Sequence, residues 1–367
     1  MDTNSFKPLI FYVNPAWRRK GVHTPILNPW WGNPYDKESL ISRKMFDSYS
    51  FDTSCYGITH DIKRAEMVLV PYIHRWLLKN DRALFDECIS VAQEFGLPIL
   101  IDGSGDIEYP IHIKNSFVLR YGGYRFLPAD NRIQIPLFVD DLLERYENGN
   151  FKIREKTEEK PIIGFAGWTR LSSRQYIRTI IKELPLRFRA LFNKQYYAGI
   201  RGIWWRRKTI RILQKSSRIT SRFELRNSFS ANPKTVEGDM KQLQKEMTDI
   251  IIQSDYALDI RGDANNSARL FEILSLGRIP VIVDTERNFP FKDVVDYSSF
   301  ALIIDFRDLH ELPERIAEFH DSISPERFKE MQIKARYAYV RYFRIDGVMK
   351  EIIKELRKKI HEANNIK

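Results

Sequence analysis

A thirty-residue stretch, Asp255 to Asp284, constrains the fold more than any other part of the chain. It begins with a short run typical of a β-strand, residues 256–260, and continues through a polar, glycine-containing turn. Apolar residues at helical spacing follow over 267–276, and a glycine ends the predicted helix. The apolar run 279–283 then suits a buried parallel strand. The stretch therefore predicts a βαβ unit, and such units bind ligands beyond the carboxyl end of a strand.

The turn after the first of these strands has the chemistry of an anion-binding site. A helix N-terminus presents unpaired N–H groups and the positive end of the helix dipole. Asn266 or Ser267 can cap this helix, and Arg261 and Arg269 bring guanidinium groups to the same place. Phosphate groups bind at such positions. The alternative is an ordinary helix cap with surface arginines, and the turn by itself favours neither reading.

Glu272 extends this site along the same helix. It lies three residues after Arg269, so its carboxylate is within reach of a sugar hydroxyl on a phosphate held at the helix tip. The alternative is a simple ion pair between Glu272 and Arg269.

The run RGDANNSARLFEILSLGRIPVIVD, residues 261–284, is part of a longer ordered motif. Phe289-Pro290-Phe291, Val295-Asp296-Tyr297 and Ser299-Phe300 follow it. This order resembles the exostosin family, glycosyltransferase family 47, with its glycine-containing turn, S-x-R-x-x-E, G-x-I-P-V, L-P-F and a later aromatic run. The resemblance implies a GT-B fold, in which two Rossmann-like domains face a central cleft, and an inverting transfer from a nucleotide-sugar.

The resemblance also implies the roles of the turn residues. The donor diphosphate is expected at the arginines and at the start of the helix, and the ribose hydroxyls are expected at Glu272. A UDP-sugar is the expected donor and acts as a co-substrate, with no other cofactor. The chain departs from the family pattern in the turn 263–266 and at Tyr297, where tryptophan is frequent. The donor-binding residues expected on this basis are Arg261, Gly262, Asn266, Ser267, Arg269 and Glu272.

The length of 367 residues predicts two domains. Alternating strand and helix patterns predict a Rossmann-like, acceptor-side domain over 1–155. The charged segment 147–160 has no apolar period and is expected to be the linker. A nucleotide-sugar-binding domain is expected over 156–320, and helices over 321–367 are expected to pack back on the first domain, as in GT-B proteins.

An inverting transfer needs a base near the acceptor hydroxyl, and this base is expected on the first domain. His74 follows one predicted strand, and Asp102, Asp106 and Glu108 follow another. One of these four is the expected base, with Asp106 and Asp102 preferred. The alternatives are an Asx-turn for the aspartates and a partly buried structural histidine.

Basic residues are concentrated in the second domain. Arg170, or alternatively Arg174, follows its first predicted strand and is a second expected donor contact. The segment 187–226 holds twelve Lys or Arg and one acidic residue, which equals the whole net charge of +11. Within it, residues 200–213 form a basic amphipathic pattern with two tryptophans. This pattern favours peripheral contact with a membrane, or equally a helix whose tryptophans pack into the core.

Several classes of protein are disfavoured. No apolar run is long enough to cross a bilayer, and the N-terminus does not have the pattern of a signal peptide. Cys55 and Cys88 are too few for a disulfide framework or a zinc site. No two aspartates are separated by one residue, so the D-x-D metal motif of GT-A enzymes is missing and no metal is expected. We expect a cytoplasmic protein, including peripheral contact with the inner membrane, similar to bacterial-type family members without a membrane anchor.

The sequence thus predicts a metal-independent inverting glycosyltransferase that acts on a glycan or lipid-linked acceptor in surface polysaccharide biosynthesis. One alternative is a GDP-sugar-using GT-B transferase that resembles fucosyltransferases. Another is a basic protein of the same fold that binds a membrane surface or nucleic acid without catalysis. Nucleic acid is not an expected partner, because no nucleic-acid motif is present.

Overall fold

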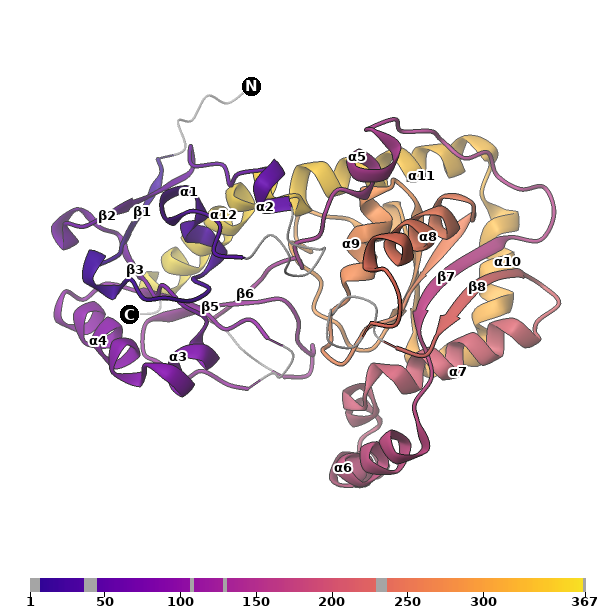
Figure 1. Ribbon diagram of the computed structural model, residues 1–367, viewed down its shortest axis with the longest axis horizontal. Coiled ribbons are helices and arrows are strands. Elements are labelled where there is room, and N and C mark those ends of the chain that lie inside the picture. Colours follow the sequence, from indigo (N-terminus) through magenta and orange to yellow (C-terminus); the bar gives the residue numbers. More distant parts are fainter. Residues whose placement is uncertain (1–6, 36–44, 106–108, 128–130, 229–235, 366–367) are drawn as a thin grey trace.

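Two fully parallel β-sheets organise the computed structural model, which describes residues 7–35, 45–105, 109–127, 131–228 and 236–365. The first sheet has the order β2-β1-β3-β4-β5-β6 (Figure 1). Its strands are short, and the central ones are buried on both faces, as expected for a parallel sheet covered by helices. Their bounds are β1 Leu9–Tyr12, β2 Tyr56–Thr59, β3 Met67–Leu69, β4 Ile99–Asp102, β5 Ser116–Arg120 and β6 Arg132–Gln134.

The second sheet has the order β11-β10-β9-β7-β8. Strand β7 pairs with both β8 and β9, so the strand order reverses between β7 and β9. In open α/β sheets, ligands bind outside the carboxyl ends of the strands at such a switch point. The bounds are β7 Ile162–Trp168, β8 Thr220–Arg226, β9 Tyr256–Asp259, β10 Ile279–Asp284 and β11 Leu302–Asp305.

Several helices begin at a capping side chain. Asp81 accepts a hydrogen bond from the N–H of Leu84 at the start of α4, and Ser324 caps α11, whose first residue is a proline. The helices of the first domain are α1 Asn28–Trp31, α2 Met45–Ser48, α3 His74–Asn80 and α4 Arg82–Glu94. The later ones are α5 Leu142–Glu147, α6 Ser173–Phe192, α7 Gly202–Lys215, α8 Met240–Ile252, α9 Ala268–Ser275, α10 Leu312–Ser322, α11 Pro325–Ala338 and α12 Ile345–Asn365.

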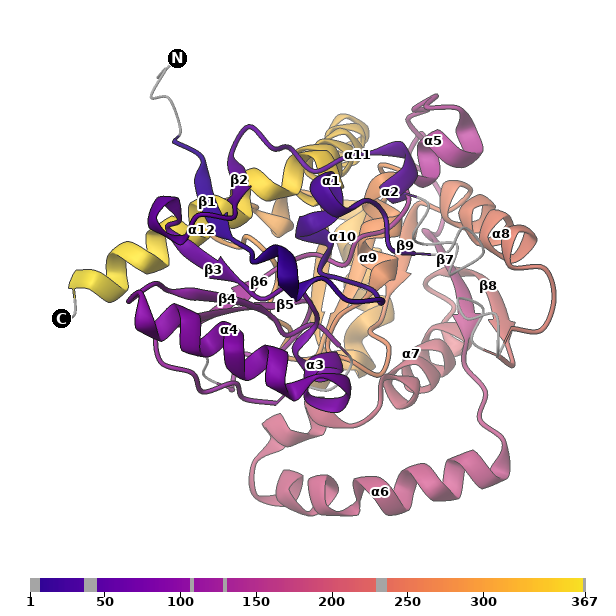
Figure 2. The same cartoon turned by 60° about the vertical axis from the view of Figure 1, so that its left-hand side comes forward.

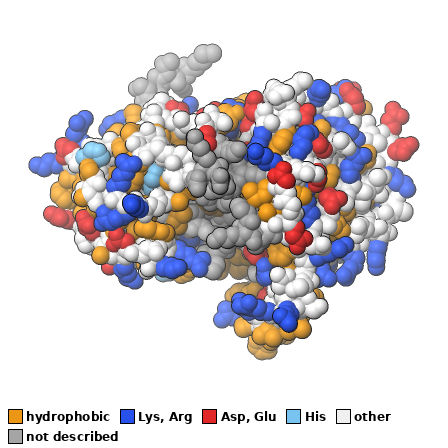
Figure 3. Space-filling model, in the orientation of Figure 1, with side chains coloured by type: hydrophobic (Ala, Val, Ile, Leu, Met, Phe, Trp, Pro, Cys, Tyr) orange, Lys and Arg blue, Asp and Glu red, His pale blue; other side chains and the backbone are white. Residues whose placement is uncertain are grey.

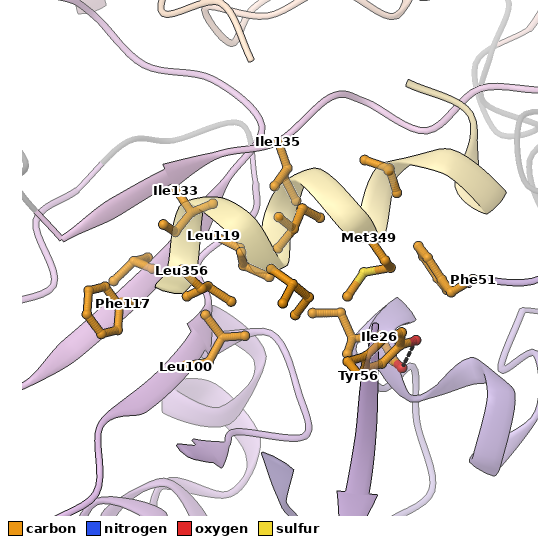
Figure 4. Close-up of a cluster of buried hydrophobic side chains, with 14 of the residues drawn as sticks. Ile26, Phe51, Tyr56, Leu100, Phe117, Leu119, Ile133, Ile135, Met349 and Leu356 are labelled. Atoms are coloured by element: carbon orange, nitrogen blue, oxygen red, sulfur yellow. Dashed lines mark hydrogen bonds between the residues drawn. The ribbon is translucent and has the colours of Figure 1, made fainter. Parts of the chain in front are cut away.

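Helix α12 returns to the first domain and completes its core. After α11, a π-helical turn, Tyr339–Phe343, leads into α12, which lies against the first sheet (Figures 1 and 4). Met349 and Leu356 are fully buried there with Leu100 and Leu119 of the sheet. Each such side chain contributes about 1.5–3 kcal/mol by leaving water. Of the helices expected to pack back, α12 does so, whereas α11 packs on α9 and β10 of the second domain.

The chain passes into the second domain earlier than residue 155. Leu142 and Leu143 of α5 are buried in one cluster with Ala166 and Ile273 of the second domain. The charged segment expected to be a linker lies on the same domain, where Arg154 forms an ion pair with the buried Asp255 at 2.9 Å. Its charges have specific partners, which composition alone does not reveal.

The loops at the carboxyl ends of the two sheets contact each other. After β5, the N–H of Arg125 donates to the carbonyl of Glu286, and the Arg125 guanidinium forms ion pairs with Asp284 at 2.8 Å and Glu286 at 3.2 Å. Asn265, in the turn after β9, donates to the carbonyl of Gly123 at 2.9 Å. Two parallel α/β domains joined in this way form the GT-B fold that the sequence predicts.

Candidate functional site

The switch point between β7 and β9 holds an arginine that the sequence analysis missed. Arg206 lies on α7, and its guanidinium reaches the carbonyls of Trp168, at the end of β7, and Ile260, just after β9, each at 3.4 Å. These bonds are long, so they leave the guanidinium weakly satisfied. Burial, together with the positive charge of Arg269, lowers the pKa of Arg206 to about 10. An anion bound here would accept stronger hydrogen bonds from the Arg206 guanidinium and would stabilise its positive charge.

Arg206 belongs to a group of three guanidinium groups, which we call the arginine cluster: Arg206, Arg226 and Arg269. Arg226 ends β8 and donates to the carbonyl of Leu243 at 2.8 Å. Burial lowers its pKa, Glu246 partly offsets this, and the charge of Arg269 lowers it further. Arg269 thus lowers the pKa of both other arginines, and three guanidinium groups near the carboxyl ends of β7, β8 and β9 form a candidate site for a strongly negative ligand.

Arg269 provides the most direct sign of such a ligand. It lies in the first turn of α9, and its Nε donates to Glu272 at 3.0 Å. Its Nη1 is buried and has no hydrogen-bond partner among the described residues. A buried donor without a partner costs about 1–3 kcal/mol, so a partner for Nη1 is worth that much to the bound state. The ion pair with Glu272 is present, but both side chains are largely buried, unlike a surface pair.

Ser267 occupies the N-cap position of α9, as expected. Its side chain makes no capping hydrogen bond, and the residue is buried. The first N–H groups of α9 therefore lie beside Arg269 without a side-chain cap, which suits an oxyanion. Gly262 and Asn266 close the preceding turn, in which the N–H of Gly262 faces the carbonyl of Asn266 at 3.4 Å.

Arg261 makes several hydrogen bonds within the protein. Its side chain is fully buried, and its guanidinium donates to the carbonyls of Ala198, Ile200 and Asp263. These bonds hold the segment 198–200 against the turn, while the buried Nε of Arg261 has no hydrogen-bond partner among the described residues. A contact of Arg261 with the diphosphate stays a prediction. Arg170 and Arg174 are both exposed. Arg170 donates to Asn227 at 3.2 Å, and Arg174 lies at the start of α6, so neither joins the arginine cluster.

Asn265 fixes the position of the turn and was also missed. Its Nδ2 donates to the carbonyls of Gly123 and Thr285, and its Oδ1 accepts from the Thr285 hydroxyl at 2.7 Å. Asn265 therefore joins the turn to a first-domain loop and to the segment after β10. An asparagine in a turn is usually read as a turn former, which hides such a role.

The candidates for the base lie in different settings. Asp102 is buried, and its two carboxylate oxygens accept from the Thr24 hydroxyl and the Ser104 N–H, each at 3.0 Å. The bond from the Ser104 N–H is the Asx-turn of the structural alternative, and the bond from Thr24 is additional. Asp106 and Glu108 lie outside the described residues.

His74 is a buried histidine with aromatic neighbours. Its Nδ1 lies 2.9 Å from the Tyr109 hydroxyl, and its ring packs on Tyr109 and Phe85. Burial, and then the positive charge of Arg120, lower the pKa of His74 to about 4. The imidazole is therefore neutral at neutral pH, and it is a weak base.

The apolar face of α7 is part of the core. Trp205, Ile210 and Leu213 are buried in the second domain, and the Trp204 Nε1 donates to Glu183 at 2.9 Å. Residues 200–213 were expected either to contact a membrane or to pack their tryptophans into the core, and α7 packs into the core.

No helix of the described chain combines the length and the apolar character needed to cross a bilayer. Within the same residues, no three His, Cys, Asp or Glu side chains are grouped so that they could hold a metal ion.

Comparison with known proteins bears on the second domain. An exostosin GT47 domain model matches residues 210–319, which include β8 to α10 and the turn after β9. The Exostosin-1 homolog of Caenorhabditis elegans is 31% identical over 120 residues, covering 31% of this chain and 30% of that protein. The probable arabinosyltransferase ARAD1 of Arabidopsis thaliana is 27% identical over 109 residues, covering 29% of this chain and 24% of that protein.

The matched region spans less than a third of either of these relatives. A crystal structure of Anabaena HepE in complex with UDP-glucose aligns with 97% of this chain and 99% of that one, at 10% identity and a TM-score of 0.35. A likeness at that score does not bear on function. The two parallel domains, joined by contacts between the loops at their strand ends, have the GT-B arrangement. Residues 210–319, which include the turn after β9, are thus similar to an exostosin GT47 domain.

Gly202, the first residue of α7, provides a test of the packing behind the site. A Cβ at this position would overlap the carbonyl oxygens of Arg261 and Gly262. We expect Gly202→Ala to lower the free energy of unfolding by about 1–3 kcal/mol, because the turn or α7 must shift. Gly262→Ala is the matched control, since the nearest atom to its Cβ would be an Arg206 nitrogen at 3.9 Å. Urea unfolding of both variants measures this, and equal stabilities would contradict the packing.

Proposed function

We propose that this protein is an inverting glycosyltransferase that takes a sugar from a UDP-sugar. One observation carries the proposal: the arginine cluster at the switch point of the second sheet, where Arg269 presents a buried N–H without a partner. The similarity to exostosins and to a probable arabinosyltransferase supports the same reaction class. A nucleoside diphosphate has the charge and the size that three guanidinium groups and a helix N-terminus can hold.

In the proposed reaction, the acceptor oxygen attacks the anomeric carbon from the face opposite the diphosphate. The bond from that carbon to the diphosphate breaks, and its electron pair stays on the leaving oxygen. Arg206 and Arg269 stabilise the growing negative charge, as preorganised electrostatic groups do in other enzymes. This arrangement needs no metal ion for the leaving group. In this proposal Glu272, which accepts a hydrogen bond from Arg269, also accepts hydrogen bonds from the ribose hydroxyls.

A first-domain group removes the proton of the acceptor hydroxyl. Among the candidates, we keep Asp106 and Glu108 ahead of Asp102, because both Asp102 oxygens already accept hydrogen bonds. His74 ranks last, because its pKa of about 4 makes it a weak base. The acceptor is proposed to be a glycan or a lipid-linked glycan in surface polysaccharide biosynthesis. Cys55 and Cys88 are free and buried, which fits action in the reducing cytoplasm.

A thermal-shift screen of UDP, GDP, CMP and their sugars tests the proposal. At a concentration of about 100 times Kd, a ligand that binds only the folded protein adds about 2.7 kcal/mol of stability. For domains of this size, that corresponds to a rise in Tm of roughly 5–10 °C. We expect this rise with UDP and UDP-sugars.

The other outcomes of the screen separate the alternatives. A rise with GDP-sugars alone would favour the GDP-sugar transferase. No rise with any nucleotide would reject the transferase. If no nucleotide raises the Tm but the protein binds lipid or RNA in a salt-dependent way, the alternative of a non-catalytic basic protein is favoured.

A further inference from the structure

Helix α6 carries a stripe of exposed apolar side chains, which we call the α6 stripe. Its members are between 54% and 79% exposed, although they are large and apolar. Their spacing of three or four residues places them within an arc of about 100° along the helix. A soluble protein rarely exposes so many large apolar residues together without a partner. The α6 stripe consists of Ile177, Ile181, Leu184, Phe188, Leu191 and Phe192.

The opposite side of α6 is the side that packs on the protein. Thr179, Glu183 and Ala190 are buried. Glu183 accepts hydrogen bonds from the N–H of Arg201 and from the Trp204 indole. The α6 stripe thus points away from these contacts, and α6 projects from the body of the second domain (Figures 1 and 2).

The exposed charges of α6 are all positive. Arg174, Arg178, Lys182 and Arg189 are exposed, whereas the one acidic residue of the helix, Glu183, is buried and paired with Arg187. At 100° per residue, Arg178, Lys182 and Arg189 lie along one edge of the α6 stripe and Arg187 along the other. Figure 3 shows hydrophobic and Lys or Arg side chains gathered on this projecting part.

We propose that α6 lies in the interface of an anionic membrane, with the α6 stripe among the acyl chains and the flanking cations at the lipid headgroups. A helix with an apolar face and a cationic polar face binds such interfaces in this orientation. Each cation near an anionic surface adds to the attraction. The acidic side chains that would repel the surface are absent from the exposed face of α6. The membrane contact expected of the basic segment therefore falls on α6 and not on α7, and it does not depend on the transferase activity.

Co-sedimentation of the whole protein with lipid vesicles tests this. We expect binding to vesicles of phosphatidylcholine mixed with phosphatidylglycerol, weaker binding to phosphatidylcholine alone, and a decrease with salt. Phe188→Ser/Phe192→Ser is expected to reduce the partition coefficient by about 10- to 100-fold, because the membrane-bound protein loses two aromatic side chains that insert among the acyl chains. Ile333→Ser/Tyr337→Ser is the matched control, since both residues are exposed apolar side chains on α11.

The charge contribution has its own pair of variants. Arg178→Glu/Lys182→Glu is expected to reduce binding to anionic vesicles by about 30-fold or more. Lys63→Glu/Arg64→Glu makes the same change of charge on the exposed surface of the first domain and is expected to have little effect. All four variants are expected to keep the Tm of the wild type, because the replaced side chains are exposed.

Three results would overturn the proposal. The first is no binding of the wild type to anionic vesicles. The second is equal binding by the wild type and Phe188→Ser/Phe192→Ser. The third is a wild-type dimer, measured by light scattering, together with no binding of the wild type to vesicles. If Phe188→Ser/Phe192→Ser is then a monomer, the α6 stripe binds a second copy of the chain.

Discussion

Replacing Arg269 with alanine is expected to raise the Kd for UDP by about 10- to 100-fold, because a charge-assisted hydrogen bond contributes about 1.5–3 kcal/mol. The turnover number is expected to fall further, by roughly 10²–10³, since the contact strengthens as charge develops on the diphosphate. Removal of Arg269 removes a buried N–H without a partner but also leaves Glu272 without its cation, so the Tm of the variant is measured beside its affinity. Calorimetric titration with UDP and the release of UDP from a UDP-sugar measure the two effects.

Arg218→Ala is the matched control for this experiment. Arg218 lies in the same domain, and its exposed guanidinium pairs with Glu314 at 2.9 Å. Its removal should change neither the Kd nor the turnover, because exposed pairs contribute little. If Arg269→Ala and Arg218→Ala bind UDP equally well, Arg269 is not a donor contact. If Arg206→Ala also binds UDP normally, the arginine cluster is not the donor site.

Replacing Arg287 with methionine is expected to destabilise the protein by about 3–5 kcal/mol. Arg287 pairs with Asp259 at 2.7 Å, and the two side chains are 3% and 0% exposed. The substitution leaves the carboxylate of Asp259 buried and without its cation, and breaking one side of a buried pair has a cost of this size. Urea unfolding measures the loss, and the Tm should fall markedly.

A second substitution separates the charge effect from the packing effect. Asp259→Asn/Arg287→Met removes both charges and is expected to recover part of the lost stability, because no buried charge remains. Arg315→Ala is the surface control, since Arg315 pairs with Glu311 at 2.7 Å and the two side chains are 48% and 44% exposed. Its effect on stability should be small, because exposed pairs contribute little. A double variant as unstable as Arg287→Met alone would show that packing, and not the pair, determines the loss.

The βαβ unit at the second switch point is the part of the fold that the sequence predicts best. The expected strand, helix and strand over 256–283 correspond to β9, α9 and β10 within one or two residues. Local signals suffice there, because the apolar periodicity and the helix-ending Gly277 both act within a few positions. The same holds for α4, which has a capping aspartate and a clear apolar face.

The roles of the arginines could not be read from the sequence in the same way. Arg261 and Arg269 both flank the turn, and each has a buried N–H without a partner among the described residues. The Arg261 guanidinium also donates to carbonyls some sixty residues earlier, whereas that of Arg269 pairs with Glu272. Arg206 stood in a basic run, where an arginine whose guanidinium reaches the strand ends looks like its neighbours in the sequence. The difference is burial, which depends on which distant backbone packs against each side chain.

The division into domains shows the same limit. Polar composition over 147–160 indicated a linker, but Asp255, buried at the edge of β9, pairs with Arg154 and fixes that segment. A charged segment is mobile only if its partners are absent, and the partners here lie about a hundred residues away. Long-range ion pairs of this kind have no local signature.

The place of α12 in the first domain has a consequence for synthesis of the chain. The strands of the first sheet leave the ribosome early, but the helix that covers Leu100 and Leu119 is made after the whole second domain. At about 5–20 residues per second, the first sheet waits tens of seconds with one apolar face open to solvent. The first domain to be translated is therefore the last to finish folding, and a nascent chain needs protection from aggregation at that face until α12 arrives.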